Sequence, residues 1–218
     1  MTDHTLVLGN KAYSSWSLRP WLALKRTGVP FEEVVIPLRQ PDTRAAILAH
    51  SPAGKVPVLR HGERTIWDSL AIIEYLADAH PAARLWPQDP HARAVARAIS
   101  AEMHAGFLPL RKALPMDLKA RHPGLAFDAE VEADIARIQA IWRDARARFG
   151  ADGPFLFGAF TAADAMYAPV VTRFDTYAVA LDPVCRAYAD AVLTLPEMRE
   201  WTAAAQAEPW VIDFGLGK

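Results

Sequence analysis

The stretch KVPVLRHGERTIWDS, residues 55–69, decides the fold of this chain. A short strand follows its Val-Pro pair, and a second strand returns over Arg64–Trp67 after a His-Gly-Glu turn, which predicts a β-hairpin. An X-Pro pair at this place favours a cis peptide bond that turns the Val56 N–H and C=O toward an extended ligand. Asp68 then opens the apolar segment Ser69–Ala79, a predicted helix whose first N–H groups favour a carboxylate.

The residues on the N-terminal side of this stretch complete an α/β unit. They predict, in order, a buried strand at His4–Leu8, a helix at Ser17–Thr27 capped by Ser17 and stopped by Gly28, a strand at Phe31–Pro37 and a short helix at Asp42–His50. With the hairpin and the helix that follow, the element order is βαβαββα. Residues 1–80 are therefore predicted to form one domain.

The residues on the C-terminal side predict a second, all-helical domain. Residues 81–90 hold three prolines and are predicted to be a linker. After them the apolar period is helical throughout residues 91–218, with predicted helices at His91–Leu118, Asp128–Phe149, Ala162–Ala178 and Pro183–Leu193. Thr161 and Asp164 have the spacing of a capping box at the start of the third of these helices, which is a folding motif.

These motifs, in this order and spacing, resemble the glutathione S-transferase family over nearly the whole chain. The resemblance implies a thioredoxin-like N-terminal domain and an all-helical C-terminal domain. It also implies that the Val56-Pro57 backbone pairs with the cysteinyl part of glutathione and that Asp68 and Ser69 hold its γ-glutamyl end. Lys55 matches a position that meets the glycyl carboxylate, and Gln40 or Arg39 in the preceding loop is a further candidate for that contact.

The expected chemistry centres on the sequence SSWS, residues 14–17, between the first strand and the first helix. Thioredoxin-like proteins carry a Cys-x-x-Cys pair here, whereas this chain has serines. A serine hydroxyl can donate to the thiolate of bound glutathione and favour its charged form. The loop resembles the zeta-like and tau-like serine classes, in which the catalytic serine lies five residues before an arginine. Ser14 has that spacing to Arg19, and Ser15 is the alternative.

The acceptor site is expected between the serine loop and the first long helix of the C-terminal domain. By resemblance its candidate lining residues are Trp16, His104, Phe107, Arg111 and, from the capped helix, Arg173. The helical spacing of Met103 and Phe107 is equally that of a core-facing stripe. His104 has no second histidine at the spacing of a metal site, and no metal is predicted.

Composition excludes several other classes of function. The 218 residues are 52% hydrophobic and 22% charged, with a formal net charge of −1, so nucleic acid is an unfavoured partner. The single cysteine, Cys185, permits neither an internal disulfide nor a cysteine-based metal cluster. The N-terminal sequence lacks the features of a signal peptide, and no apolar run is long enough to span a membrane. A cytoplasmic protein is expected.

The sequence therefore predicts a glutathione transferase that activates the thiol of glutathione, as its substrate or cofactor, for conjugation to a small electrophile. The resemblance further implies a homodimer and a role in detoxification. One alternative is a glutathione-dependent isomerase of the zeta (maleylacetoacetate) type, acting on an unsaturated diacid. The other is a transferase-like binding or scaffold protein without catalysis.

Overall fold

The N-terminal half of the chain is built on a four-stranded sheet with the strand order β2-β1-β3-β4. The structure, a computed structural model, describes residues 3–215. Strand β1 (His4–Gly9) runs parallel to β2 (Glu32–Ile36) and antiparallel to β3 (Val58–His61), which forms the predicted hairpin with β4 (Arg64–Ile66). The parallel pair needs a crossover, which helix α1 (Ser15–Thr27) supplies.

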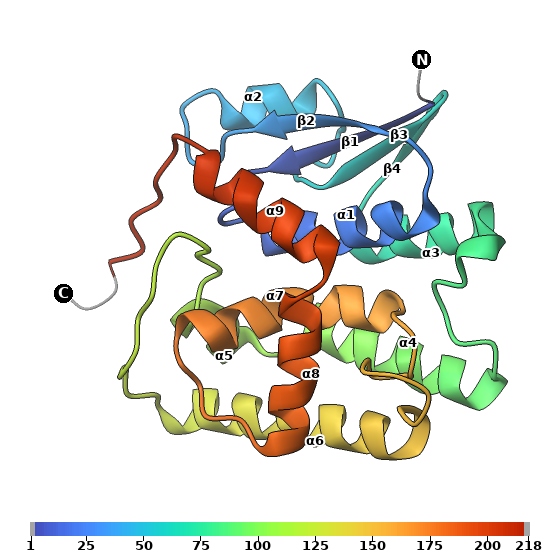
Figure 1. The fold of residues 1–218 in the computed structure, drawn as a ribbon. Helices are drawn as coiled ribbons and strands as arrows, with labels where there is room; N and C mark the ends of the chain where they lie inside the picture. Colours follow the sequence, from blue (N-terminus) through green and yellow to red (C-terminus); the bar gives the residue numbers. More distant parts are fainter. Residues whose placement is uncertain (1–2, 216–218) are drawn as a thin grey trace.

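Strand alternation divides the apolar residues of the sheet between two layers of helix (Figure 1). Leu6, Leu8 and Leu59 face α1 and α3 (Ser69–Ala79) and belong to the large core that continues into the helical half. Val7 and Val58 face the opposite side, where Ile47 of α2 (Thr43–Leu48) covers them. The sheet thus holds the loop before α1 and the N-terminus of α3 at the boundary with the helical half.

In the residues that the structure describes, the C-terminal half consists of helices joined by loops, with two isolated β-bridges at residues 155–159. Its helices are α4 (Pro90–Ala105), α5 (Leu108–Ala113), α6 (Ala129–Phe149), α7 (Ala162–Thr176), α8 (Pro183–Leu193) and α9 (Pro196–Ala207). Helix α7 lies at the centre, packed on α1, α4 and α8, and nearly all of its residues are buried. The two halves therefore share one apolar core.

The predicted capping box stands at the start of α7. Asp164 is completely buried, and its Oδ2 accepts hydrogen bonds from the Thr161 N–H (2.7 Å) and the Thr161 hydroxyl (2.9 Å). Its Oδ1 accepts from the N–H of Leu156 (3.1 Å), in the turn before the helix. One carboxylate therefore satisfies donors of both the helix and the preceding turn.

The predicted helix His91–Leu118 is wrong as a single element, because it is interrupted between α4 and α5. Gly106 is extended and Phe107 takes a positive φ of 58°. The reason is Pro109, which in a continuing helix could not donate to the Ala105 carbonyl and whose ring would clash with it, whereas it is tolerated in the first turn of α5. The break reorients the chain at the edge of the boundary between the two halves.

The structure also adds detail to the prediction at three other places. Helix α1 begins at Ser15 with Ser14 as its N-cap residue, so Ser17 lies inside the helix and is not its cap. The predicted linker, residues 81–90, includes a 3₁₀ turn (η1, Pro81–Ala83) and the buried side chains of Leu85 and Trp86. Helix α9 was not predicted at all, although it begins with a proline at its first position, as many helices do.

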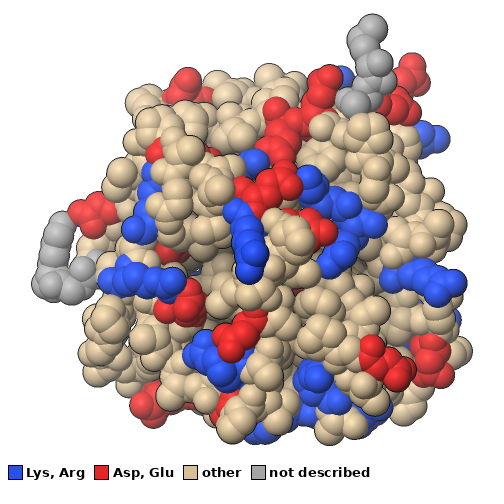
Figure 2. All heavy atoms as spheres, in the orientation of Figure 1, with Lys and Arg blue, Asp and Glu red and all other residues tan. Residues whose placement is uncertain are grey.

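Acidic and basic side chains are intermixed on the surface. Figure 2 shows Lys and Arg beside Asp and Glu over the face it presents, in keeping with the small net charge. Ion pairs between surface side chains, such as Arg97–Glu74 and Arg137–Glu102, join neighbouring elements. Within residues 3–215, the helices are too short or too polar to cross a bilayer.

Candidate functional site

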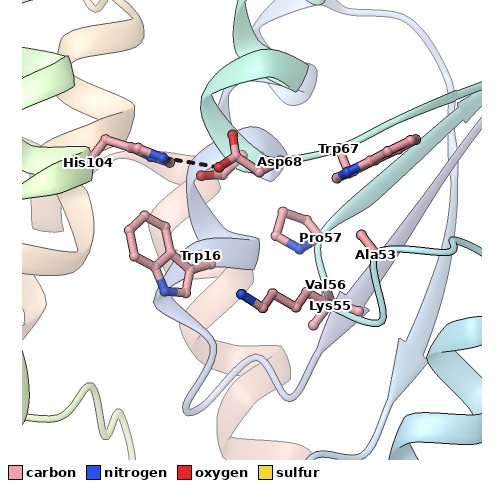
Figure 3. A pocket seen from close by; sticks show the side chains of 9 residues that line it. Trp16, Ala53, Lys55, Val56, Pro57, Trp67, Asp68 and His104 are labelled. Atoms are coloured by element: carbon pink, nitrogen blue, oxygen red, sulfur yellow. Dashed lines mark ion pairs between the residues drawn. The ribbon is translucent and has the colours of Figure 1, made fainter.

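A cavity of about 260 Å³ opens at the boundary between the sheet and the helical half (Figure 3). Four segments line it: the loop before β3, the end of β4 with the N-terminus of α3, the first turn of α1, and α4. The lining residues are Trp16, Ala53, Lys55, Val56, Pro57, Trp67, Asp68, Ser69 and His104. The cavity thus brings together residues 55–57 and residues 67–69, the two ends of the stretch quoted first, with Trp16 in the first turn of α1.

The Val56-Pro57 peptide bond is cis, as predicted. Val56 lies two residues before β3 and outside its ladder, so the ladder does not use its main-chain groups. These groups stand at the cavity wall in the position where an extended peptide could pair with them as a neighbouring strand does. Lys55 is exposed at the rim, and its side chain extends across the cavity toward Trp16 (Figure 3).

Asp68 and Ser69 form the N-terminal end of α3, at the opposite wall. The Asp68 Oδ1 accepts from the N–H of Leu70 (3.1 Å) and of Ala71 (3.4 Å), which makes Asp68 the N-cap. Its Oδ2 forms an ion pair with the His104 Nε2 at 3.0 Å, so a residue of α4 orients the carboxylate. The Ser69 side chain is 1% exposed, and its hydroxyl has no hydrogen-bond partner.

An unpartnered hydroxyl beside a helix N-terminus is suited to an anion. A buried polar atom normally has a partner, and the N–H groups and dipole of α3 favour negative charge at the same place. The exposed part of the Asp68 carboxylate favours a cation beside it. The wall therefore fits a group that carries a carboxylate and an ammonium on one carbon.

The serines of the predicted loop, Ser14, Ser15 and Ser17, are all buried. The Ser14 hydroxyl donates to the Ser17 Oγ at 2.8 Å, and the same Ser17 Oγ accepts from the N–H of Gly9 at 3.0 Å. The Ser15 Oγ accepts from the Arg173 Nη2 at 3.2 Å, which leaves its own hydrogen free to donate. Neither Ser14 nor Ser15 is among the residues that line the cavity, whereas Trp16, the next residue along the chain, lines it.

Arg19 and Arg111 contact the Trp16 ring, and Arg173, from a third helix, bonds to the adjacent Ser15; these three residues form an arginine cluster. The Arg19 guanidinium lies 4.3 Å from the Trp16 ring centroid and that of Arg111 lies 5.1 Å from it. Arg19 is completely buried, and its Nη1 and Nη2 have no partner, while its Nε donates to the Met166 carbonyl at 3.0 Å. Arg173 is 4% exposed and donates to the Leu114 carbonyl at 2.7 Å.

This cluster carries positive charge that is only partly compensated, by the charge of Asp134 near Arg111. In the part of the chain that the structure describes, Arg19, Arg111 and Arg173 form no ion pair with a carboxylate. Burial, and then the charge of Arg111, lowers the pKa of Arg173 to about 10. Burial, and then the charges of Arg173 and Arg111, holds the pKa of Arg19 well below its ordinary value. An anion placed beside Trp16 relieves this repulsion.

Some predicted site residues lie elsewhere. Gln40 is exposed, and its side chain donates to the Leu38 carbonyl at 3.5 Å rather than lining the cavity. Arg39 stacks on Phe214 at 5.1 Å. Phe107 is buried in the core at the start of α5, and Met103 is completely buried there too, so core packing is the role that the structure assigns to both.

Other lining residues were not predicted. Ala53 and Trp67 line the cavity, and Trp67 remains 46% exposed. The sequence does hold a sign that Trp67 lies at the site, because an aromatic residue stands directly before Asp68 at the end of an edge strand. Among residues 3–215, no group of three or more His, Cys, Asp or Glu side chains is arranged to hold a metal ion.

Comparison with known families agrees with this arrangement. The sequence profile described as "Glutathione S-transferase, N-terminal domain" matches residues 13–79, which include the serine loop and the Asp68-Ser69 pair. The profile described as "Glutathione S-transferase, C-terminal domain" matches residues 128–204, from α6 into α9. The two profiles follow one another in the same order as the two halves of the structure.

Individual relatives have names drawn from several branches of one family. A probable maleylacetoacetate isomerase of Caenorhabditis elegans is 42% identical over 96 residues, a segment that spans 44% of this chain and 44% of the relative, so less than half of that protein is matched. A maleyl pyruvate isomerase, described as a bacterial glutathione S-transferase of the zeta class, is 28% identical with a TM-score of 0.68, covering 94% of this chain and 99% of that one.

A further solved structure supports the fold. A glutathione transferase homologue from Burkholderia with bound glutathione has a TM-score of 0.70 at 23% identity, and the match covers 94% of this chain and 99% of the other. The two family profiles, the strand order and the helical half together show that this chain belongs to the glutathione S-transferase family.

Proposed function

We propose that the chain is a glutathione transferase that binds glutathione in the cavity beside α3 and holds its sulfur as a thiolate for attack on a small electrophile. One observation carries the proposal. A single cavity is lined by the cis Val56-Pro57 turn, by Asp68 and by the unpartnered hydroxyl of Ser69, next to the first turn of α1. These groups match the cysteinyl main chain and the γ-glutamyl ammonium and carboxylate of an extended glutathione molecule.

Each wall has a proposed role in binding. The main chain of Val56 pairs with the cysteinyl residue, the Asp68 carboxylate holds the γ-glutamyl ammonium, and the Ser69 hydroxyl with the N-terminus of α3 holds the γ-glutamyl carboxylate. Lys55 meets the glycyl carboxylate at the rim. Gln40 lies outside the lining, so Lys55 is the proposed partner for that carboxylate.

The proposed chemistry needs no base from the enzyme. The hydroxyl of Ser14, at the N-cap of α1, turns from Ser17 to donate to the sulfur, and Ser15 is the alternative donor. The thiol proton leaves to solvent. The thiolate then forms a bond to the electrophilic carbon, and the leaving group or the adjacent multiple bond takes the displaced electron pair. The protein contributes thiolate stabilisation and positioning.

The experiment that tests the function is a titration of the purified protein with glutathione across pH. Thiolate absorbance in the ultraviolet and binding heat are followed together. Saturable binding with a thiol pKa below that of free glutathione is the expected result. Absence of binding contradicts the proposal and leaves the fold in use for something else.

Replacing Asp68 by asparagine is expected to weaken glutathione binding by about 10-fold or more, because a hydrogen bond to a charged group is worth about 1.5–3 kcal/mol. Asparagine retains an oxygen that can cap α3, so the helix keeps its N-terminal partner. The measurement is the Kd by calorimetry. Asp78, exposed on the same helix, gives the matched control Asp78→Asn. An unchanged Kd in Asp68→Asn contradicts the role given to this carboxylate.

A second candidate is a glutathione-dependent isomerase of the zeta (maleylacetoacetate) type, in which glutathione adds to a double bond and is returned. The observation that favours it is the arginine cluster around Trp16, where Arg19, Arg111 and Arg173 have no carboxylate partner. An acceptor with carboxylate groups fits that charge. The isomerases named among the relatives support the same reading.

For this candidate, Arg173→Ala is expected to lower the kcat/KM for cis-to-trans isomerisation of an unsaturated diacid by about 10-fold or more, the loss of one charged hydrogen bond. Proton NMR follows the double bond, and a thiol assay shows that glutathione is not consumed. Because Arg173 also bonds to the Leu114 carbonyl, the conservative variant Arg173→Lys is measured as well. Arg121→Ala is the control, since Arg121 is exposed and pairs with Asp175 of α7. Activity confined to conjugation in the wild-type protein contradicts this candidate.

We further propose that the protein works as a cytoplasmic homodimer in the detoxification of electrophiles. The family resemblance supports this. Trp67, a large apolar side chain that is 46% exposed at the rim of the cavity, is consistent with a partner near the site.

A further inference from the structure

The turn that precedes α1 sets the position of the serine loop. The Asn10 carbonyl accepts from the N–H of Tyr13 (3.1 Å) and of Ser14 (2.8 Å), and the Asn10 Oδ1 accepts from the N–H of Leu38 at 2.7 Å. Within this turn, Lys11 and Ala12 are buried. Their main-chain N–H groups therefore need partners from outside the turn.

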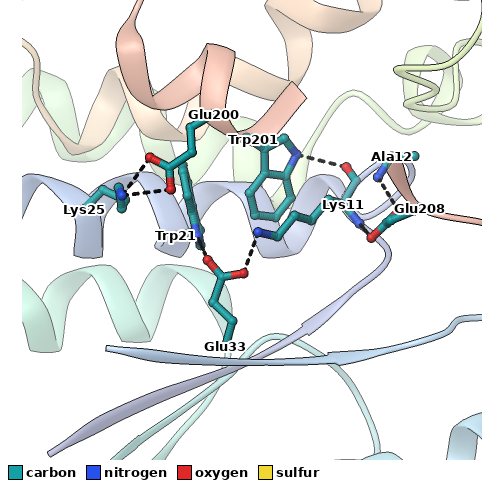
Figure 4. Close-up of polar contacts among 8 residues, drawn as sticks. All are labelled: Lys11, Ala12, Trp21, Lys25, Glu33, Glu200, Trp201 and Glu208. Atoms are coloured by element: carbon teal, nitrogen blue, oxygen red, sulfur yellow. Dashed lines mark hydrogen bonds and ion pairs between the residues drawn. The ribbon is translucent and has the colours of Figure 1, made fainter. Parts of the chain in front are cut away.

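A residue from the far end of the chain supplies both partners. The Glu208 Oε1 accepts from the Lys11 N–H at 2.7 Å, and the Oε2 accepts from the Ala12 N–H at 3.1 Å (Figure 4). Glu208 directly follows α9 and is 196 residues from Ala12 in the sequence. A carboxylate that accepts two N–H groups forms charge-assisted hydrogen bonds, which are stronger than neutral ones.

Helix α9 also holds the other side of the same peptide. The Trp201 Nε1 donates to the Lys11 carbonyl at 2.9 Å, and its ring packs on Trp21 with centroids 5.0 Å apart. The Lys11 ammonium pairs with Glu33 of β2 at 2.5 Å (Figure 4). The N–H, the C=O and the side chain of Lys11 are thus each held by a different residue.

Glu208 is itself fixed in place. The Lys119 ammonium donates to the carbonyl oxygen of Glu208, and also to that of Trp210 at 3.5 Å. The Tyr13 hydroxyl donates to the same Trp210 carbonyl at 3.5 Å. The segment after α9 is therefore seated on the turn, so the carboxylate meets the turn in one position.

We propose that Glu208 is a positioning residue for thiol activation, holding the turn at residues 10–14 so that Ser14 faces the sulfur. This inference rests on the proposed function. Ser14 is the last residue of the turn and the N-cap of α1, so a shift of the Lys11-Ala12 peptides moves it. A displacement of about 1 Å is enough to lower a rate substantially.

If Glu208 acts by positioning, its removal changes the thiol pKa in one direction; if it acts through its charge, its removal changes that pKa in the opposite direction. Removing a negative charge near a thiolate favours the thiolate, so it lowers the thiol pKa. Removing the carboxylate that holds the serine turn weakens the hydrogen bond to the thiolate, so it raises the thiol pKa. The direction of the shift therefore separates the two roles, and loss of fold alone does not produce it.

The test measures the pKa of enzyme-bound glutathione, its Kd and kcat in wild-type protein, Glu208→Ala, Glu208→Gln and the control Glu200→Ala. Glu200 lies on α9, the helix that Glu208 follows, and pairs with Lys25 at 2.8 Å, away from the turn. Glu208→Ala is expected to raise the bound thiol pKa by about one unit and to lower kcat about 10-fold near neutral pH, with Kd nearly unchanged. Glu208→Gln keeps one acceptor oxygen and is expected to give a smaller rise.

The outcomes separate the inference from the function. Wild-type protein that does not lower the thiol pKa contradicts the proposed function and this inference with it. Wild-type activation together with an unchanged or lowered pKa in folded Glu208→Ala overturns the inference alone. If Glu208→Ala does not fold, Glu208→Gln decides, because a wild-type pKa in that variant also overturns the inference.

Discussion

Replacing Ser14 by alanine is expected to lower the kcat for conjugation by about 100-fold and to raise the pKa of bound glutathione by about two units, while Kd changes little. Two pKa units correspond to about 2.7 kcal/mol. One hydrogen bond to a charged group supplies about 1.5–3 kcal/mol, and the N-terminus of α1 adds roughly 0.3–1 kcal/mol. A single hydroxyl at the N-cap therefore accounts for the activation.

Binding should survive because the proposed binding contacts lie on other elements. Val56, Asp68 and Ser69 line the cavity from the loop before β3 and from α3, whereas Ser14 is 6% exposed and is not a lining residue. The substitution also removes the hydroxyl that donates to Ser17, but Ser17 keeps the N–H of Gly9 as a partner. The loss should therefore appear in kcat and in the thiol pKa rather than in Kd.

Two further variants complete this measurement. Ser100 is a buried serine on α4 whose hydroxyl donates to the Ala96 carbonyl at 2.7 Å, so Ser100→Ala controls for the loss of a buried hydroxyl outside the site. Ser15→Ala tests the alternative donor, whose oxygen already accepts from Arg173. If Ser15→Ala shows the raised pKa and Ser14→Ala does not, the donor is Ser15.

Replacing Asp164 by alanine is expected to destabilise the fold by roughly 3–4 kcal/mol, because each buried donor left without a partner costs about 1–3 kcal/mol. The N–H of Leu156, the N–H of Thr161 and the Thr161 hydroxyl all donate to this one carboxylate. Alanine leaves them inside the core without their protein acceptor. The effect spreads to α1 and α4, since α7 packs on both.

Urea unfolding followed by circular dichroism measures this change in the free energy of unfolding. Asp152, exposed in the turn before α7, gives the control Asp152→Ala, which should change stability by less than about 0.5 kcal/mol. Glutathione binding by folded Asp164→Ala should be close to wild type, because Asp164 does not line the cavity. A loss of stability below about 1 kcal/mol would falsify the role of this carboxylate in the core.

Local patterns predicted well the structural elements that line the cavity and the cap of α7. The hairpin after Val56-Pro57, the helix at Ser69–Ala79 and the capping box at Thr161 are all present. Each depends on contacts within a few residues, such as the bonds from Asp68 to the N–H groups of Leu70 and Ala71. Turn and cap chemistry of this range is visible in a sequence.

The arginine cluster and the hydrogen bonds from Glu208 to the turn at residues 10–14 depend on contacts that no local pattern contains. Arg173 reaches Ser15 across 158 residues, and Arg19 reaches the Met166 carbonyl across 147. The break at Phe107 was not predicted, although Pro109 lies far inside a helix that begins at Pro90. Only the packed structure shows which arginines converge on Trp16.

The bond between Ala12 and Glu208 orders events during synthesis of the chain. The 196 residues between them take about 10–40 s to add at the usual 5–20 residues per second. The sheet and α1 can form in that time, but the serine turn has no carboxylate for its N–H groups until α9 has been made. In a nascent chain, the turn at residues 10–14 therefore lacks these two hydrogen bonds until Glu208 has been added.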